Sequence, residues 1–96
     1  MLENKFKTKL IDELECTFPG CIITHMDPNE IQGIPDLLIL YNDKWAALEG
    51  KKNASAPARP NQPYYVDLMN GMSFASFIYP ENKDEVIRKL RLHFMN

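Results

Sequence analysis

The stretch from Gly33 to Lys52, GIPDLLILYNDKWAALEGKK, constrains the fold of this chain more than any other segment. The apolar run Asp36–Tyr41 follows Pro35 and predicts a short buried strand. Asn42–Asp43 comes next, and both residue types tolerate a left-handed backbone, which predicts a tight hairpin. The run Lys44–Lys51 then predicts the second strand of that hairpin.

Three chemically reactive side chains are expected to converge at one end of this hairpin. Alternate residues of a strand share a face, so Glu49 and Lys51 lie on the same side of the second strand. Antiparallel pairing brings Asp36, at the start of the first strand, beside the end of the second. Two carboxylates and one amine are therefore predicted to meet.

Such a group suits metal-dependent hydrolysis. Neighbouring carboxylates repel one another, which raises the pKa of one of them or favours a divalent cation between them. Mg²⁺ prefers oxygen ligands and keeps several waters, so Asp36, Glu49 and a backbone carbonyl form a sufficient protein site. Lys51 is then placed to orient the attacking water or to stabilise charge on a phosphate. The alternative is structural: Asp36 is then a simple strand-start residue after Pro35, and Glu49 and Lys51 form a solvated pair on an edge strand.

The spacing of these residues resembles a known nuclease pattern. Pro35-Asp36, a hairpin, and then Glu49-Gly50-Lys51 looks like the PD-(D/E)xK signature. The fuller string Gly33–Leu37, with Gln62 downstream, is most similar to the small virus-type replication-repair nuclease (VRR-NUC) module and to phage Holliday-junction resolvases. The resemblance extends from Glu3 to about Tyr79.

The resemblance implies roles for individual residues. Asp36, Glu49 and the Gly50 carbonyl are expected to hold Mg²⁺ or Mn²⁺, Lys51 to position the water, and Gln62 to support it. Relatives often carry a bulky apolar residue where this chain has Gly50, and a slip of one residue would make Lys52 the working amine.

An acid on the first helix could complete the metal site. Glu3 falls near the centre of that helix's apolar stripe, where many nucleases of this superfamily place a metal-directed glutamate. The alternative is that Glu3 complements the helix dipole from the first turn. Glu13 is a second candidate acid, nearer the margin of the stripe.

The rest of the chain predicts a single α/β domain over residues 1–96, with a mixed four-stranded sheet flanked by helices, as in the restriction-endonuclease-like core that the resemblance implies. The expected order is αβββαβα. Asn61 is expected to cap the second helix, with Gly71 near its stop. Apart from the hairpin, the expected elements are helices over about 2–16, 61–71 and 81–94, and strands over about 21–26 and 73–79.

The formal charge of −2 argues mildly against a nucleic-acid partner, but the distribution of basic residues matters more. The loop after Lys51 is small, polar and broken by proline, and it carries Lys52 and Arg59, which are candidates for DNA-backbone contacts; a plain linker has the same composition. Tyr64 could stack on an unpaired base.

The expected partner is DNA, above all branched or four-way-junction DNA, cut by a homodimer that supplies two sites. The alternatives are a flap or nicking nuclease working with a replication or repair helicase, and a non-catalytic DNA-binding module on the nuclease fold.

No apolar run approaches membrane-spanning length and no signal peptide is visible, which predicts an intracellular, cytoplasmic protein. Compactness favours a phage origin, with action in the host cytoplasm. Cys16 and Cys21 are expected to be reduced thiols in or near the core.

Overall fold

The computed structural model describes the backbone of residues 2–95 and the side chains of residues 5–95. Three helices and four strands follow one another in the predicted order αβββαβα. Their bounds are α1 Leu2–Thr17, β1 Ile22–His25, β2 Leu37–Tyr41, β3 Lys44–Gly50, α2 Gln62–Met72, β4 Ala75–Ile78 and α3 Lys83–Met95.

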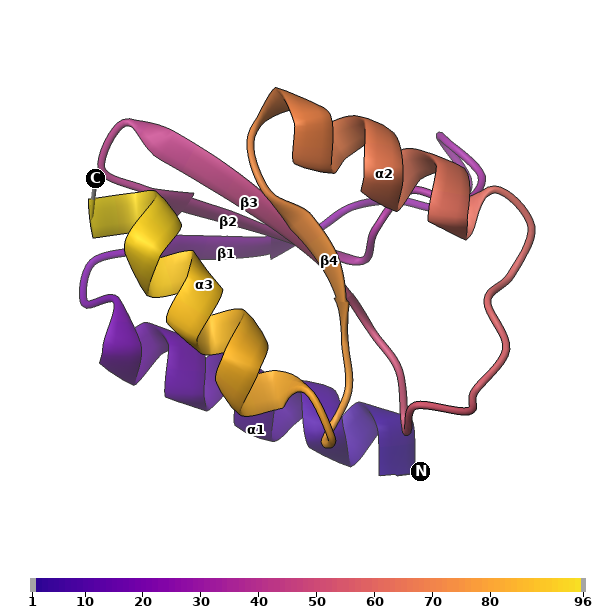
Figure 1. The fold of residues 1–96 in the computed structure, drawn as a ribbon, viewed down its shortest axis with the longest axis horizontal. Helices are drawn as coiled ribbons and strands as arrows, with labels where there is room; N and C mark the ends of the chain where they lie inside the picture. Colours follow the sequence, from indigo (N-terminus) through magenta and orange to yellow (C-terminus); the bar gives the residue numbers. More distant parts are fainter. Residues whose placement is uncertain (1, 96) are drawn as a thin grey trace.

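The four strands form one mixed sheet in the spatial order β1-β2-β3-β4. The pairs β1–β2 and β2–β3 are antiparallel, whereas β3 and β4 are parallel. Helix α2, which connects β3 to β4, lies on one side of the sheet, and α1 and α3 lie on the other (Figure 1). The predicted α/β class, with a mixed four-stranded sheet flanked by helices, is therefore confirmed.

The central hairpin forms as the sequence predicts. Leu37 pairs with Leu48 and Tyr41 pairs with Lys44, so a two-residue turn joins β2 to β3. Asn42 in that turn has a φ of 55°, the left-handed conformation that asparagine tolerates. This register places the residue before Leu37 directly beside the end of β3.

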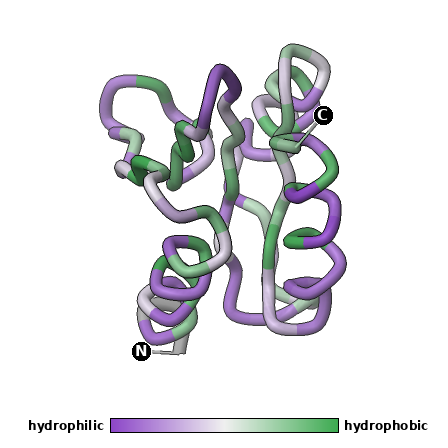
Figure 2. The backbone as a smooth tube through the Cα atoms, turned by 90° about the vertical axis from the view of Figure 1, so that its left-hand side faces the viewer, coloured by the Kyte–Doolittle hydropathy of each residue, from purple (hydrophilic) through white to green (hydrophobic). Residues whose placement is uncertain are grey.

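Two apolar clusters hold the helices to the sheet. The larger lies between the sheet and the pair α1 and α3, and the smaller is formed under α2 by Ala47, Val66 and Ala75. Hydrophilic and hydrophobic residues alternate along the helices, as expected for helices with one buried side (Figure 2). The larger cluster consists of Leu10, Leu14, Phe18, Leu37, Ile39, Ala46, Leu48, Ile78, Val86, Ile87, Leu90 and Phe94.

Of three local expectations, two were wrong and one was confirmed. Asn61 precedes α2 but has a φ of 70° and makes no side-chain capping bond, because its backbone is in the left-handed conformation instead of the extended one that a capping side chain needs. Gly71 lies in the last turn of α2, which ends at Met72, so the helix stops near this glycine as predicted. Cys16 is exposed, although both cysteines are free thiols as expected.

Within residues 2–95, none of the helices has the length and apolar character needed to cross a membrane.

Candidate active site

Asp36 and Glu49 meet at the end of the β2–β3 hairpin. The backbone N–H of Asp36 donates a hydrogen bond to Glu49 Oε1, with 3.1 Å between the two atoms. The Asp36 carbonyl accepts a bond of 2.8 Å from the backbone N–H of Met26, which extends the β1–β2 ladder by one residue. A backbone bond from Met26 on one side and a bond to the Glu49 side chain on the other therefore fix the position of Asp36.

Glu49 is a buried carboxylate, with only 6% of its surface exposed. Burial raises the pKa of this carboxyl above its ordinary value of 4.5, and the nearby negative charge of Asp36 acts in the same direction. The positive charges of Lys51 and Lys7 act in the opposite direction and lower this pKa. A buried carboxylate in these surroundings favours a neighbouring cation.

Lys51 is held by the first residue of α2. Its Nζ donates a bond of 2.7 Å to Gln62 Oε1 and a longer bond of 3.4 Å to the carbonyl of Pro57. The same Gln62 oxygen accepts a bond of 2.8 Å from the backbone N–H of Arg59. Lys51 and Gln62 are 6% and 7% exposed, so the ammonium has a fixed position. Lys52, the alternative amine, is exposed.

These side chains line one cavity of about 280 Å³, into which the Gly33 turn, the ends of the hairpin and the start of α2 all project. The structure therefore brings together Asp36, Glu49, Lys51, Gln62 and Arg59 of the predicted residues. Lys51 also borders a second cavity, of about 520 Å³, between α2, β4 and the loop that follows β3.

Lys7 of α1 also lines this cavity, and sequence reasoning did not place it there. Its Nζ lies 2.8 Å from Asp36 Oδ2. The available signal was its spacing from Glu3, because residues four apart in a helix share a face. Since Glu3 was already expected to face the site, Lys7 could have been expected there too.

The other candidates are placed as follows. Glu3 lies in α1, but its side chain is outside the described residues. Glu13 bonds Lys83 Nζ through its carboxylate at 2.7 Å, on the side where α1 meets α3. Tyr64 is 62% exposed on α2, and neither it nor Lys52 lines the 280 Å³ cavity.

The donor set fits a hard divalent cation. Within the described side chains no group of three or more His, Cys, Asp or Glu residues could hold a metal. Asp36 and Glu49 are the two carboxylates that line the 280 Å³ cavity. Two carboxylates and the Gly50 carbonyl are enough for Mg²⁺, which keeps several of its waters. The ammonium of Lys7 already stands against Asp36 as a cation would.

Comparisons with known proteins identify the fold. No family model matches the chain, and no curated protein matches it either. A solved structure described as a VRR_NUC domain protein aligns with a TM-score of 0.68, covering 99% of this chain and 89% of that one at 17% sequence identity. The chain has the VRR-NUC fold. At this identity the likeness shows the fold alone.

Proposed function

We propose that this chain is a metal-dependent, structure-specific endodeoxyribonuclease that hydrolyses phosphodiester bonds in branched DNA, and that it resolves Holliday junctions. The observation that carries the proposal is the meeting of Asp36, buried Glu49 and the Gln62-bound Lys51 in one cavity. The VRR-NUC fold supports a nuclease, because the described relative is a VRR_NUC domain protein.

Each residue has a part in the proposed reaction. Asp36, Glu49 and the Gly50 carbonyl would hold Mg²⁺ or Mn²⁺, which would supply positive charge to the phosphate as negative charge develops on it. Lys51 would orient the attacking water and stabilise the same charge as a positioned ammonium. The water oxygen would bond to phosphorus and lose a proton to solvent, while the bond to the sugar oxygen would break and that oxygen would take a proton from solvent. Gln62 keeps the Lys51 ammonium in one place throughout.

The DNA backbone would lie along the loop that follows β3. Arg59 borders the cavity, and Lys52 is exposed on the same loop. Tyr64, exposed on α2, offers a face for stacking on an unpaired base. Since the chain carries a net charge of −2, these local positive charges and the bound cation would supply the attraction to phosphate.

Two opposed cuts made together in a four-way junction require two active sites, and each chain has the one described. We therefore propose a homodimer as the acting form. The face of the sheet opposite α1 and α3 supports this proposal, because Ile22 and Leu40 pair across β1 and β2 there with 60% and 40% of their surfaces exposed.

The test is a substrate panel. Labelled four-way junction, flap, single-stranded and linear duplex DNA are incubated with Mg²⁺ or Mn²⁺, with wild type and Glu49→Gln side by side. Paired symmetrical cuts in the junction that vanish in the variant are expected. Cutting of the flap or single strand alone would keep the chemistry and replace the resolvase role by flap or nicking activity. If no DNA is cut with either metal, the proposed enzymatic activity is wrong, and a non-catalytic DNA-binding module is the better assignment.

A further inference from the structure

Lys7 and Lys51 both border the active-site cavity, but they are held differently. Lys51 is buried and bonded to two oxygens, from Gln62 and Pro57. The Lys7 side chain extends from α1 past Gly50 to Asp36 and is 20% exposed. Its Nζ lies 2.8 Å from Asp36 Oδ2. Water therefore reaches the Lys7–Asp36 pair. The Lys7 ammonium can move away into water, and the Asp36 carboxylate that it leaves is not fully buried.

Gly50 makes room for this crossing. A Cβ atom added to Gly50 would lie 3.0 Å from Cε and 3.1 Å from Cγ of Lys7. The aliphatic part of Lys7 thus runs over the backbone of the residue whose carbonyl is a proposed metal ligand. A larger side chain at position 50 would compete for that space.

The ammonium of Lys7 stands at the carboxylate that a divalent cation must also use. Two positive charges a few ångströms apart on one carboxylate repel each other strongly in a partly buried site. Lysine has a long flexible stem and a point charge, so it can swing away at little cost.

We infer that Lys7 is an exchangeable counter-ion of Asp36: it neutralises this carboxylate in the metal-free protein and is displaced when a divalent cation binds. The inference rests on the proposed function, because it takes Asp36 and Glu49 to be the metal ligands. Lys7 thereby sets the metal affinity of the site without being a ligand.

The test measures Mn²⁺ binding to the DNA-free protein by calorimetry and by the electron paramagnetic resonance of free Mn²⁺. Lys7→Met is expected to bind Mn²⁺ roughly threefold to tenfold more tightly, the size expected from removing a partly exposed ion pair. Lys7→Gln should behave alike, whereas Lys7→Arg should restore the wild-type affinity. Lys9→Met, an exposed residue on the same helix, removes the same charge and should stay within about twofold of wild type.

The arms separate this inference from the proposed function. If wild type binds no Mn²⁺, or binds it equally well after Glu49→Gln, the proposed metal site is wrong, and the inference is wrong with it. If wild type binds Mn²⁺ through Glu49 but Lys7→Met and Lys7→Gln bind it no more tightly, only the inference is overturned. Circular dichroism and a thermal melt establish that each variant is folded.

Discussion

At the scale of single residues, Lys51 carries the sharpest prediction. Lys51→Met should reduce the single-turnover cleavage rate by about a hundredfold or more, because a positioned charge at the reacting phosphate is lost. Mn²⁺ affinity should not fall, since Lys51 is not a ligand. Gln62 Oε1 keeps its bond from the Arg59 N–H, so the free energy of unfolding should change by no more than about 1–2 kcal/mol.

The comparison variant is Lys52→Met, the exposed neighbour in sequence. Lys52→Met should leave the single-turnover cleavage rate unchanged and should weaken DNA binding modestly. A cleavage rate within a few-fold of wild type for Lys51→Met, together with a large loss for Lys52→Met, would exchange the roles assigned to the two amines.

At the scale of elements, the turn at Gly33, which precedes β2, packs against the residues that immediately precede α2. Gly33 has a φ of 93°, and an added Cβ would lie 2.6 Å from Asn61 Cβ and 2.9 Å from the Pro60 carbonyl oxygen. Gly20 has a similar φ of 89° with no atom within 4 Å of the added Cβ, so it is a matched control for backbone strain alone.

Gly20→Ala should therefore cost about 1 kcal/mol of unfolding free energy. Gly33→Ala should cost about 2–4 kcal/mol, because overpacking against Pro60 and Asn61 adds to the strain. Urea unfolding of the two variants measures both values. Equal losses would mean that the Gly33 turn does not press on the start of α2.

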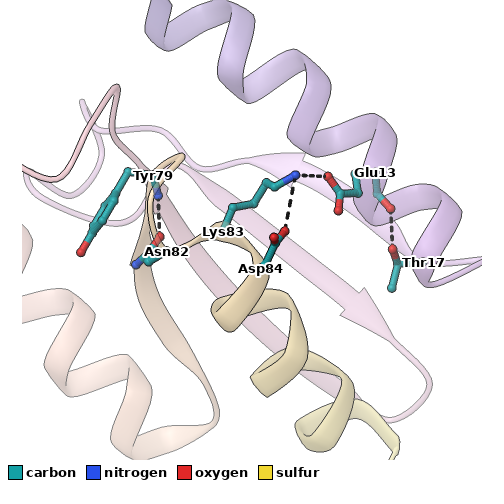
Figure 3. A network of polar contacts seen from close by, with 6 residues as sticks. All are labelled: Glu13, Thr17, Tyr79, Asn82, Lys83 and Asp84. Carbon is teal, nitrogen blue, oxygen red and sulfur yellow. Dashed lines mark hydrogen bonds and ion pairs between the residues drawn. The ribbon is translucent and has the colours of Figure 1, made fainter.

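The contact between α1 and α3 gives a prediction with a pH dependence. Lys83 Nζ lies 2.7 Å from Glu13 Oε1 and 3.8 Å from Asp84 Oδ1 (Figure 3). The hydrogen bond that Lys83 donates to Glu13, together with the charge of that carboxylate, raises the pKa of Lys83 above its ordinary value of 10.5. Because the folded pKa is raised, the pair stabilises the fold fully below the unfolded pKa, and this stability is lost as the pH rises through the folded pKa.

Lys83→Met should thus lower the free energy of unfolding at neutral pH by at most about 1 kcal/mol, since water screens a pair this exposed. The difference from wild type should shrink at pH values above 10.5. Lys89→Met, whose 3.3 Å pair with Glu85 lies within α3, should cost less. Denaturant melts at neutral and alkaline pH give both differences, and a constant difference across pH would contradict the role of the pair.

These elements also indicate how far the sequence could be interpreted on its own. The hairpin, its turn and the approach of Asp36 to Glu49 follow from short-range patterns, because alternation and turn chemistry act over a few residues. The spacing from Glu3 gives the face of α1 on which Lys7 lies, but the contact of Lys7 with Asp36 and the packing of Asn61 against Gly33 could not be obtained from such patterns. Lys7 reaches Asp36 because Gly50 has no side chain, and Asn61 packs against Gly33; both depend on contacts between segments distant in sequence.

At the scale of the whole molecule, the uncovered part of the sheet bears on the proposed dimer. α2 covers the β3–β4 half of one face through Val66, which packs with Ala47 and Ala75. The β1–β2 half of that face carries the exposed pair Ile22 and Leu40. Exposed apolar side chains that adjoin across two strands suit an interface with a second copy better than they suit water.

Leu40→Lys should therefore shift the protein from dimer to monomer, because a charge on each subunit would be buried at the interface. Sedimentation of free protein, and of the Glu49→Gln protein on uncut junction, measures the mass. Junction products should change from paired cuts to single nicks, while cutting at a single flap continues.

The control is Leu92→Lys, which places a lysine at a 56% exposed leucine of α3 and should leave the mass and the junction products unchanged. A wild type that is monomeric both free and on the junction would contradict the dimer and require the two cuts to be made one after the other by one subunit.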